Sequence, residues 1–212
     1  RASTRAPRMS AGGAGVIEGD PPQPIADRYE AATDMLAELH HQALPETLPL
    51  TPQLTYDIPR FDIDAWLVEI GLMLEWYLPD RGAELSRRRR AEFVAMWRAL
   101  LEKPAAAPQT WVLRDFHSPN IIWLSDRAGI KRIGLIDFQD AVVGPVTYDL
   151  VSLLRDCYIQ WPVAQVQEWA RIYHSLLSTR GLLADTDETL FLRWFDWMGL
   201  QRNLKIVGIF AR

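Results

Sequence analysis

Apolar positions recur with the period of a helix over most of the chain. Ile25, Tyr29, Ala32, Leu36 and Leu39 follow one another at steps of four and three, which predicts a helix with one buried face. Further helices are predicted at about 62–77, 86–101, 147–158, 162–178 and from about 185 onward. The pattern therefore predicts a mainly helical protein.

The middle of the chain has a different pattern. Gln109–Leu113, Ile121–Leu124 and Ile133–Ile136 are short apolar runs of strand length. The polar segment 125–132, which contains Gly129, joins the last two runs and predicts a hairpin with a rather long loop. Helices, a small β insertion and helices again follow in order, so a doubly wound parallel sheet is not expected.

The start of the chain lacks any apolar period. Residues 1–24 are rich in Gly, Pro, Ala, Ser and Arg, which predicts a flexible tail or the remnant of another segment. The prolines between residues 45 and 59 predict a Pro-rich connector, because each discourages helix at the residue before it. Because the chain begins with Arg1 and its last residues still read as a helix interior, we expect domain 25–212 to be truncated at both ends.

Composition and charge narrow the classes of function. The net charge of −4 argues against a nucleic-acid partner, because phosphate binding normally leaves a basic surplus. The exception is Arg87–Arg90, which we predict to be a solvated helix face. Cys157 is the single cysteine and is predicted to be a buried small side chain. No apolar run approaches the ~20 residues of a membrane span, so we expect no membrane partner and a cytoplasmic location.

Most of the unusual polar residues lie in the β insertion. Asp115 follows the first strand and precedes a turn that contains Pro119, while Asn120 and Asp137 lie at the two ends of the predicted hairpin. Pairing of the hairpin strands brings those two ends together. A carboxylate can orient and deprotonate an attacking hydroxyl, and a second carboxylate with an amide oxygen can hold Mg²⁺. The pattern therefore favours phosphoryl transfer.

Three motifs of this region carry a resemblance to known proteins. The order Asp-x-x-x-x-Asn and then a strand ending in Asp-Phe resembles the catalytic loop and metal-binding motif of protein kinases. The segments RDFHSPN, GLIDFQDA and GPVTYDLVSLLRD look still more like the aminoglycoside phosphotransferase and choline kinase family. Within it, they resemble the bacterial kinases that phosphorylate the anomeric hydroxyl of N-acetylmuramate and N-acetylglucosamine. The resemblance covers roughly residues 25–212.

The resemblance implies an α+β, mainly α fold: the C-terminal lobe of a protein-kinase-like fold, with a small β-hairpin carrying the catalytic loop. It implies Asp115 as the catalytic base, Asn120 and Asp137 as metal ligands, and ATP and Mg²⁺ as cofactors. Arg114 and Asp149 would support the catalytic loop, the latter by accepting backbone hydrogen bonds. The positions that would face a small sugar substrate are His117, Gln139 and Asp140.

The sequence departs from the kinase pattern at two places. The His that usually stands two residues before the catalytic Asp is Leu113, and the following place holds Arg114. The final Gly of Asp-Phe-Gly is Gln139. Both departures look like those of the sugar-kinase branch, so they favour that branch.

Several polar residues also have a purely structural interpretation. Asp115 could be a turn residue and Asn120 a cap, although Asp137 and Asp149 make that combination a poor explanation. His117 could equally be a loop histidine whose hydrogen bonds are satisfied. His40 and His41 lie at a predicted helix end, where a cation is favourable, and they indicate no catalytic role.

A nucleotide-binding N-terminal lobe is not recognisable in the sequence. The three lysines, Lys103, Lys131 and Lys205, all follow the helices that open the resemblance. The Gly12–Gly15 stretch imitates a phosphate loop, but no alternating strands flank it and no lysine follows. Two functions stay open: a sugar kinase represented by its C-terminal lobe, and a non-catalytic fragment or pseudokinase that only binds a ligand or partner.

Overall fold

The computed structural model describes residues 23–212, and side chains from Ile25 onward. The helices are α1 (Gln23–His40), α2 (Ile63–Leu72), α3 (Leu78–Asp80), α4 (Arg87–Ala105), α5 (Tyr148–Leu154), α6 (Val163–Thr179) and α7 (Glu188–Phe210). The strands are β1 (Thr47–Thr51), β2 (Leu54–Asp57), β3 (Gln109–Val112), β4 (Ile121–Trp123), β5 (Ile133–Leu135) and β6 (Val142–Pro145). The predicted tail, residues 1–24, lies almost entirely outside this part of the chain. The mainly helical character is confirmed.

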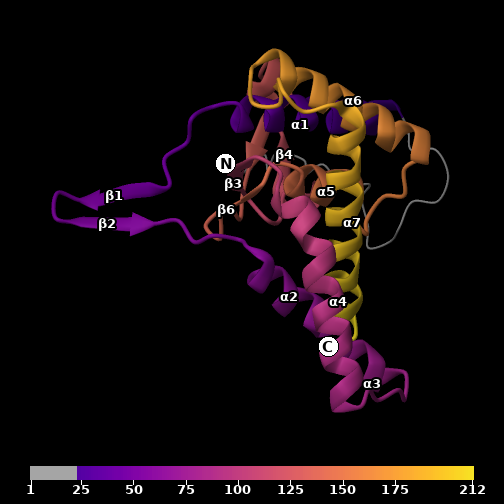
Figure 1. Cartoon of the computed structure of the whole chain (residues 1–212). Coiled ribbons are helices and arrows are strands. Elements are labelled where there is room, and N and C mark those ends of the chain that lie inside the picture. Colours follow the sequence, from indigo (N-terminus) through magenta and orange to yellow (C-terminus); the bar gives the residue numbers. More distant parts are fainter. Residues whose placement is uncertain (1–22) are drawn as a thin grey trace, which may run out of the picture.

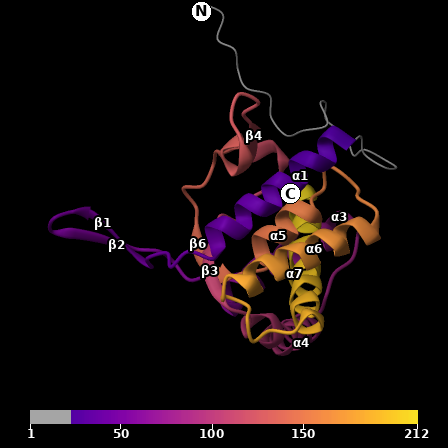
Figure 2. The ribbon, with the colours of Figure 1, turned by 90° about the horizontal axis from the view of Figure 1, so that it is seen from above.

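Helix α7 runs through the middle of the molecule and organises the other helices (Figure 1). It packs against α2, α4, α5 and α6, while α1 lies across α5 and α6 (Figure 2). The core between these helices contains large aromatic side chains, and the most completely enclosed of them include Tyr29, Trp66, Tyr148, Tyr173 and Phe191. Burial of such side chains stabilises the packing of α1, α2, α5, α6 and α7 around one core.

Helix α2 and α7 approach each other closely at one glycine. Asp62 caps α2 by accepting a hydrogen bond from the N–H of Ala65. The helical path continues through a π-helical segment, Met73–Tyr77, into α3. A Cβ added to Gly208 of α7 would lie 2.4 Å from the carbonyl carbon of Leu72 and 2.6 Å from the nitrogen of Met73. Only glycine therefore allows this packing.

Three separate two-stranded antiparallel sheets are described. The predicted hairpin is confirmed, because Ile121 pairs with Leu135 and Trp123 with Ile133. The first predicted strand pairs with β6, which the sequence analysis did not predict. This pairing joins residues on both sides of the β4–β5 hairpin and so ties the loop after β3 to the loop before α5.

The Pro-rich connector between residues 45 and 59 contains no helix, as expected, but the sequence analysis did not predict that it forms strands. This segment forms the β1–β2 hairpin, which projects from the body of the protein in both ribbon views (Figures 1 and 2). Both strands of a two-stranded hairpin are edge strands, so Pro49 can occupy β1 without breaking a ladder on its outer side. The prolines therefore disfavour helix in this segment but do not prevent an edge strand.

Two helix boundaries also differ from the prediction. Helix α5 ends at Leu154, not near residue 158, because the Asp156 carboxylate accepts hydrogen bonds from the N–H groups of Tyr158 and Ile159 and forms a turn there. Helix α7 begins at Glu188 and not near residue 185. Its cap is Asp187, whose side chain accepts a hydrogen bond from Leu190.

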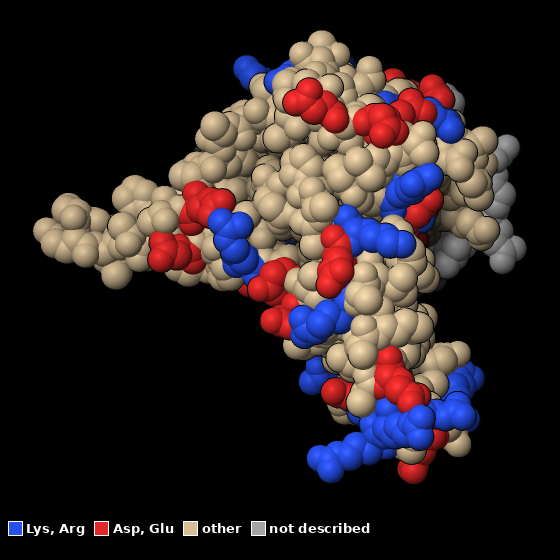
Figure 3. Space-filling view, in the orientation of Figure 1, with Lys and Arg blue, Asp and Glu red and all other residues tan. Residues whose placement is uncertain are grey.

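The surface mixes both signs of charge. Arg87–Arg90 form the exposed first turn of α4, and basic side chains gather at that end of the molecule, around α3 (Figures 1 and 3). The predicted solvated arginine face is confirmed. Among residues 23–212, no helix is long and apolar enough to cross a membrane.

Candidate active site

Asp115 lies on the loop that follows β3, and its side chain is exposed. The preceding residue, Arg114, has a φ of 66°, in the left-handed region that side chains other than glycine rarely adopt. Such a conformation costs free energy and persists only where the surroundings fix it. The question at this site is therefore what holds Arg114 in place.

The backbone around Arg114 is held from α5. The two carboxylate oxygens of the fully buried Asp149 accept hydrogen bonds from the N–H groups of Leu113, at 2.6 Å, and Arg114, at 3.0 Å. The carbonyl oxygen of Arg114 accepts from the hydroxyl of Ser152, at 3.2 Å, and from the guanidinium of Arg202, at 3.4 Å. The backbone N–H and the backbone carbonyl of Arg114 are therefore both hydrogen-bonded. These bonds fix the backbone from which the side chain of Asp115 projects.

The side chain of Arg114 enters a buried cluster of charged groups. Glu69 of α2 accepts from Arg114 at 3.1 Å, from Lys205 at 2.8 Å and from Gln201 at 3.0 Å. The buried hydroxyl of Tyr148 lies 3.4 Å from the same carboxylate. One carboxylate thus joins α2, the loop of Asp115, α5 and α7, and we call this group of residues the Glu69 cluster.

Asn120 connects Asp115 to the β4–β5 hairpin. Its side-chain amide donates to the carbonyl of Asp115 at 3.1 Å, and its own carbonyl accepts from the N–H of Ile136 at 3.1 Å. Asp137 is the next residue and has a φ of 63°, so the chain turns sharply as it leaves β5. Gln139 donates to Oδ1 of Asp137 at 2.7 Å. These contacts bring Asp115, Asn120 and Asp137 to one end of the hairpin.

The groups at this end of the hairpin fit a hard cation such as Mg²⁺. The amide nitrogen of Asn120 is bonded to Asp115, so its side-chain oxygen is the atom left for a ligand. Of the two carboxylate oxygens of Asp137, only Oδ1 is bonded within the described part of the chain. Oxygen donors of this kind are those that Mg²⁺ prefers.

His117 lies next to Asp115 and faces an aromatic side chain. The rings of His117 and Tyr158 meet edge to face, with centroids 5.6 Å apart. Burial of His117, with a further contribution from the Arg202 guanidinium, lowers the pKa of the imidazole below its ordinary value of 6.5. The imidazole next to the predicted base is therefore favoured in its neutral form.

A cavity of about 480 Å³ opens beside the loop that carries Tyr158. Its lining combines an aromatic ring with side chains that can donate and accept hydrogen bonds, among them Asp156, Gln160, Trp161 and Asn203. Asp156 accepts from the hydroxyl of Tyr29 at 3.1 Å, and burial raises the pKa of its carboxyl group. The size and the mixed lining of the cavity suit a small polar molecule.

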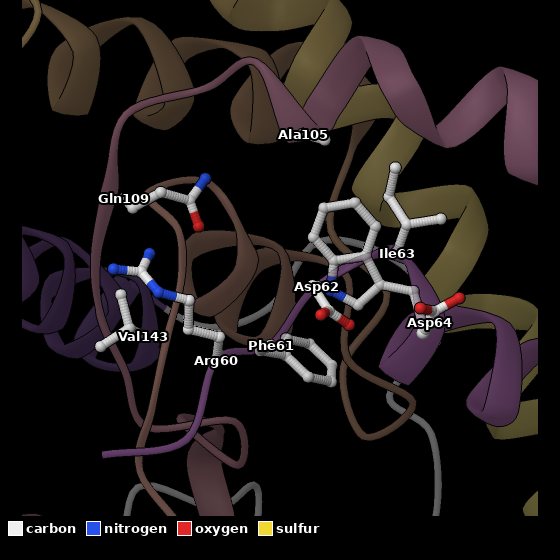
Figure 4. Close-up of a pocket in the computed structure, with 9 residues that line it drawn as sticks. Arg60, Phe61, Asp62, Ile63, Asp64, Ala105, Gln109 and Val143 are labelled. Atoms are coloured by element: carbon white, nitrogen blue, oxygen red, sulfur yellow. The ribbon is translucent and has the colours of Figure 1, made fainter. Parts of the chain in front are cut away.

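A second cavity, of about 350 Å³, lies at the other end of β3 (Figure 4). It is lined by Gln109 at the start of that strand and by Arg60, Phe61 and Ile63 near the start of α2. None of its lining residues is one of the predicted site residues. The same is true of the cavity near Tyr158, which is related to the site only through the contact between the rings of Tyr158 and His117.

The remaining residues named in the sequence analysis lie outside the group formed by Asp115, Asn120 and Asp137 or differ from their predictions. Gln139 and Asp140 are exposed, and Gln139 contacts Asp137 and does not line the cavity beside Tyr158. The prediction that Cys157 is a buried small side chain is wrong, because it is half-buried and lines that cavity. His40 ends α1, as predicted. His40 is buried, and its Nε2 lies 3.8 Å from Asp149.

Sequence reasoning missed Glu69, Tyr158, Arg202 and Lys205. Glu69 and the two cations lie on otherwise apolar buried faces of α2 and α7, which was the available signal. A charged residue on the buried stripe of a helix normally has a partner. No comparable signal marks Tyr158, which lies on an irregular segment.

The sequence was also compared with known proteins. A family model described as phosphotransferase enzyme family matches residues 4–187. An N-acetylmuramate/N-acetylglucosamine kinase of Neisseria meningitidis is 39% identical over 156 residues, which are 73% of this chain and 45% of that protein. Proteins of the same name from Pseudomonas putida and Caulobacter vibrioides are each 33% identical, over 83% and 88% of this chain. The chain spans about half the length of these curated relatives.

Proposed function

The chain belongs to the phosphotransferase enzyme family, and we propose that it carries the catalytic part of a kinase that transfers a phosphoryl group from ATP to a sugar hydroxyl. The observation that supports this best is the arrangement around Asp115. The exposed carboxylate of Asp115 follows the strained residue Arg114, whose backbone is held by hydrogen bonds. Asn120 and Asp137 lie at the same end of the hairpin. Phosphoryl transfer depends mainly on such positioning.

In this proposal each residue has a separate role. Asp115 orients the acceptor hydroxyl and takes its proton as the phosphoryl group is transferred. Asn120 and Asp137 hold Mg²⁺, which neutralises charge on the nucleotide phosphates when it is bound. Arg114 and Asp149 keep the loop in the conformation that presents Asp115.

We further propose that the acceptor is a cell-wall amino sugar such as N-acetylmuramate or N-acetylglucosamine. The names of the relatives support this, and the cavity lined by Asp156, Gln160 and Trp161, which flank Tyr158 in the sequence, offers a site for a small polar molecule. An aromatic ring with neighbouring amide and carboxylate groups provides both apolar and hydrogen-bonding contacts for a sugar. Gln139 and Asp140 stay candidates for contacts with the sugar.

A second candidate is a chain that binds a ligand or partner without turnover, and the placement of the lysines favours it. Lys205 is engaged by Glu69, and Lys103 lies 5.4 Å from the ring of Trp197. Lys131 is exposed in the loop between β4 and β5. Two of the three lysines are thus engaged elsewhere in the described part of the chain, and none makes a printed contact with Asn120 or Asp137.

Magnesium- and ATP-dependent phosphorylation tests the proposal. The assay compares this chain with a fusion in which the N-terminal half of the Pseudomonas putida relative precedes it. The acceptors are N-acetylmuramate, N-acetylglucosamine, choline and kanamycin. We expect the fusion to phosphorylate the two sugars and the isolated chain to be much slower. If the fusion binds ATP and phosphorylates none of the four, the kinase proposal is wrong. Faster transfer to choline or kanamycin would overturn the sugar assignment.

A further inference from the structure

Helices α2 and α4 lie side by side and leave a groove between them (Figure 1). The chain leaves α2 through the π-helical segment and α3 and then returns as α4, so the two helices run in opposite directions. The groove has a volume of about 480 Å³, and apolar side chains line it, among them Leu67, Val68, Leu72 and Val94. Val68 is 72% exposed and Val94 is 37% exposed. Contiguous exposed apolar side chains of this kind often mark an interaction surface.

The two walls of the groove carry opposite charges. Asp64 and Glu75 line it on the side of α2 and the π-helical segment, while Arg90 and Arg98 line it on the side of α4. Arg98 donates to Asp64, so these two residues mark one end of the groove. Because the helices are antiparallel, Glu75 and Arg90 lie toward the other end. Both are exposed, and neither forms an ion pair within residues 23–212.

We propose that this groove is the interface of a homodimer, in which α2 of each copy packs against α4 of the other. A second copy fits the groove because the acidic wall and the basic wall are complementary to each other. With the twofold axis parallel to the helices, the acidic wall of each copy faces the basic wall of its partner. Glu75 then lies opposite Arg90 of the partner subunit, and Val68 packs over Val94 of the partner subunit.

Charge also selects this arrangement over the one with the twofold axis across the helices. In that case each acidic wall would face an acidic wall and each basic wall a basic wall, and like charges placed opposite each other disfavour association. The favoured arrangement brings the arginine-rich ends of both copies to the same end of the dimer. Arg81 and Arg88 at that end are paired with Asp80 and Glu92, which limits the repulsion.

The size of the groove predicts a weak dimer. The helical path from Ile63 to Tyr77 is about 22 Å long, and two packed helices are about 20 Å wide. Each copy would therefore bury roughly 450 Å², which is less than the ~800 Å² per partner of a standard interface. We expect a dissociation constant in the micromolar range, so that at submicromolar concentration the chain is mostly monomeric.

Sedimentation of the 212-residue chain from about 1 µM to about 500 µM tests the dimer, because this range spans the expected dissociation constant. Val68→Glu places two carboxylates in the interface and should raise the dissociation constant more than about tenfold. The matched control is Val163→Glu at the start of α6, since Val163 is also 72% exposed and lies outside the groove. A chain that stays monomeric at the highest concentration, or equal effects of the two substitutions, would overturn the proposal.

A mixing experiment tests which walls face each other. Glu75→Arg and Arg90→Glu should each weaken the homodimer, because each places like charges opposite each other across the twofold axis. A 1:1 mixture of the two variants should associate more tightly than either alone, since every arginine then faces a glutamate. Asp126→Arg mixed with Arg90→Glu is the control, because Asp126 is an exposed carboxylate outside the groove. A mixture that associates no more tightly than its components would contradict the facing walls.

The fusion protein tests a different occupant of the groove. We expect it to dimerise with a dissociation constant within about threefold of that of the isolated chain, and to be weakened by Val68→Glu in the same way. A dimeric chain and a monomeric fusion would show that the N-terminal half covers the groove, and would overturn the proposal. Association requires no turnover, so these results do not depend on the outcome of the kinase assay.

Discussion

The Asp115 loop has two sides that differ in burial. We call the exposed side with Asp115 and Asp137 the front, and the buried side with Asp149 and Glu69 the back. On the front, Asp115 and Asp137 are exposed, and each has few contacts with the protein. On the back, Asp149 and Glu69 are buried, and the backbone N–H and carbonyl of Arg114 are both hydrogen-bonded. The conformational strain lies at Arg114, between the two sides.

This difference indicates that the exposed groups are suited to binding and the buried groups to positioning them. Groups that hold a substrate or a cation must be open to solvent and free of strong internal partners. The rigidity that directs them must then come from side chains that never meet the substrate. Substitutions on the front should therefore change activity with little change in stability, and substitutions on the back should change stability first.

The largest expected effect belongs to the front. In the fusion protein, Asp115→Asn should lower kcat by about 10²- to 10⁴-fold, because it removes the group that we propose takes the proton. Its unfolding midpoint in denaturant should stay close to that of the wild type, since the side chain is exposed. The control is Asp126→Asn, an exposed carboxylate in the loop between β4 and β5. An unchanged rate in Asp115→Asn would show that the base has been assigned to the wrong residue.

On the back, Glu69→Ala should give the largest loss of stability. It leaves the buried Lys205 and the partly buried Arg114 without their carboxylate, which we expect to cost roughly 3–5 kcal/mol of unfolding free energy. Denaturant unfolding of this chain measures the effect. Glu75→Ala is the matched control, an exposed glutamate in the π-helical segment that follows α2. Equal stability of the two variants would contradict the structural role of the Glu69 cluster.

A smaller loss is expected where α7 meets α2. Gly208→Ala introduces a Cβ that would lie 2.4 Å from the backbone of Leu72, so α7 must shift. Overpacking of this kind costs about 1–3 kcal/mol. Gly71→Ala is the control, because a Cβ there meets no atom within 4 Å. We expect Gly208→Ala to lower the thermal midpoint and Gly71→Ala to leave it unchanged or raised.

The smallest effect concerns pH and the front of the loop. The folded protein holds the pKa of His117 below 6.5, so near that pH the unfolded chain binds more protons than the folded one. Stability should accordingly fall as the pH decreases below about 6.5. In His117→Asn this part of the acid dependence should disappear, as measured by unfolding free energies between pH 7 and pH 5. An identical slope in both proteins would contradict the burial of the imidazole.

Several of these features could be predicted from the sequence because they depend on neighbouring residues. The period of α1 and the β4–β5 hairpin both arise from short segments. The β1–β2 hairpin could not be predicted, because its prolines are tolerated only where an edge strand lacks a partner. Membership of the phosphotransferase family, which three motifs indicated, is confirmed by the family match.

The sequence by itself determined the groups at the front of the loop: the order and spacing of Asp115, Asn120 and Asp137 select them before any fold is known. Only the tertiary structure decided what stands behind them. Asp149 reaches the loop across 36 residues, and Gln201 meets Glu69 across 132. Such contacts depend on the packing of α1, α2, α5 and α7 around one core, and packing is a property of the whole chain that no local pattern contains.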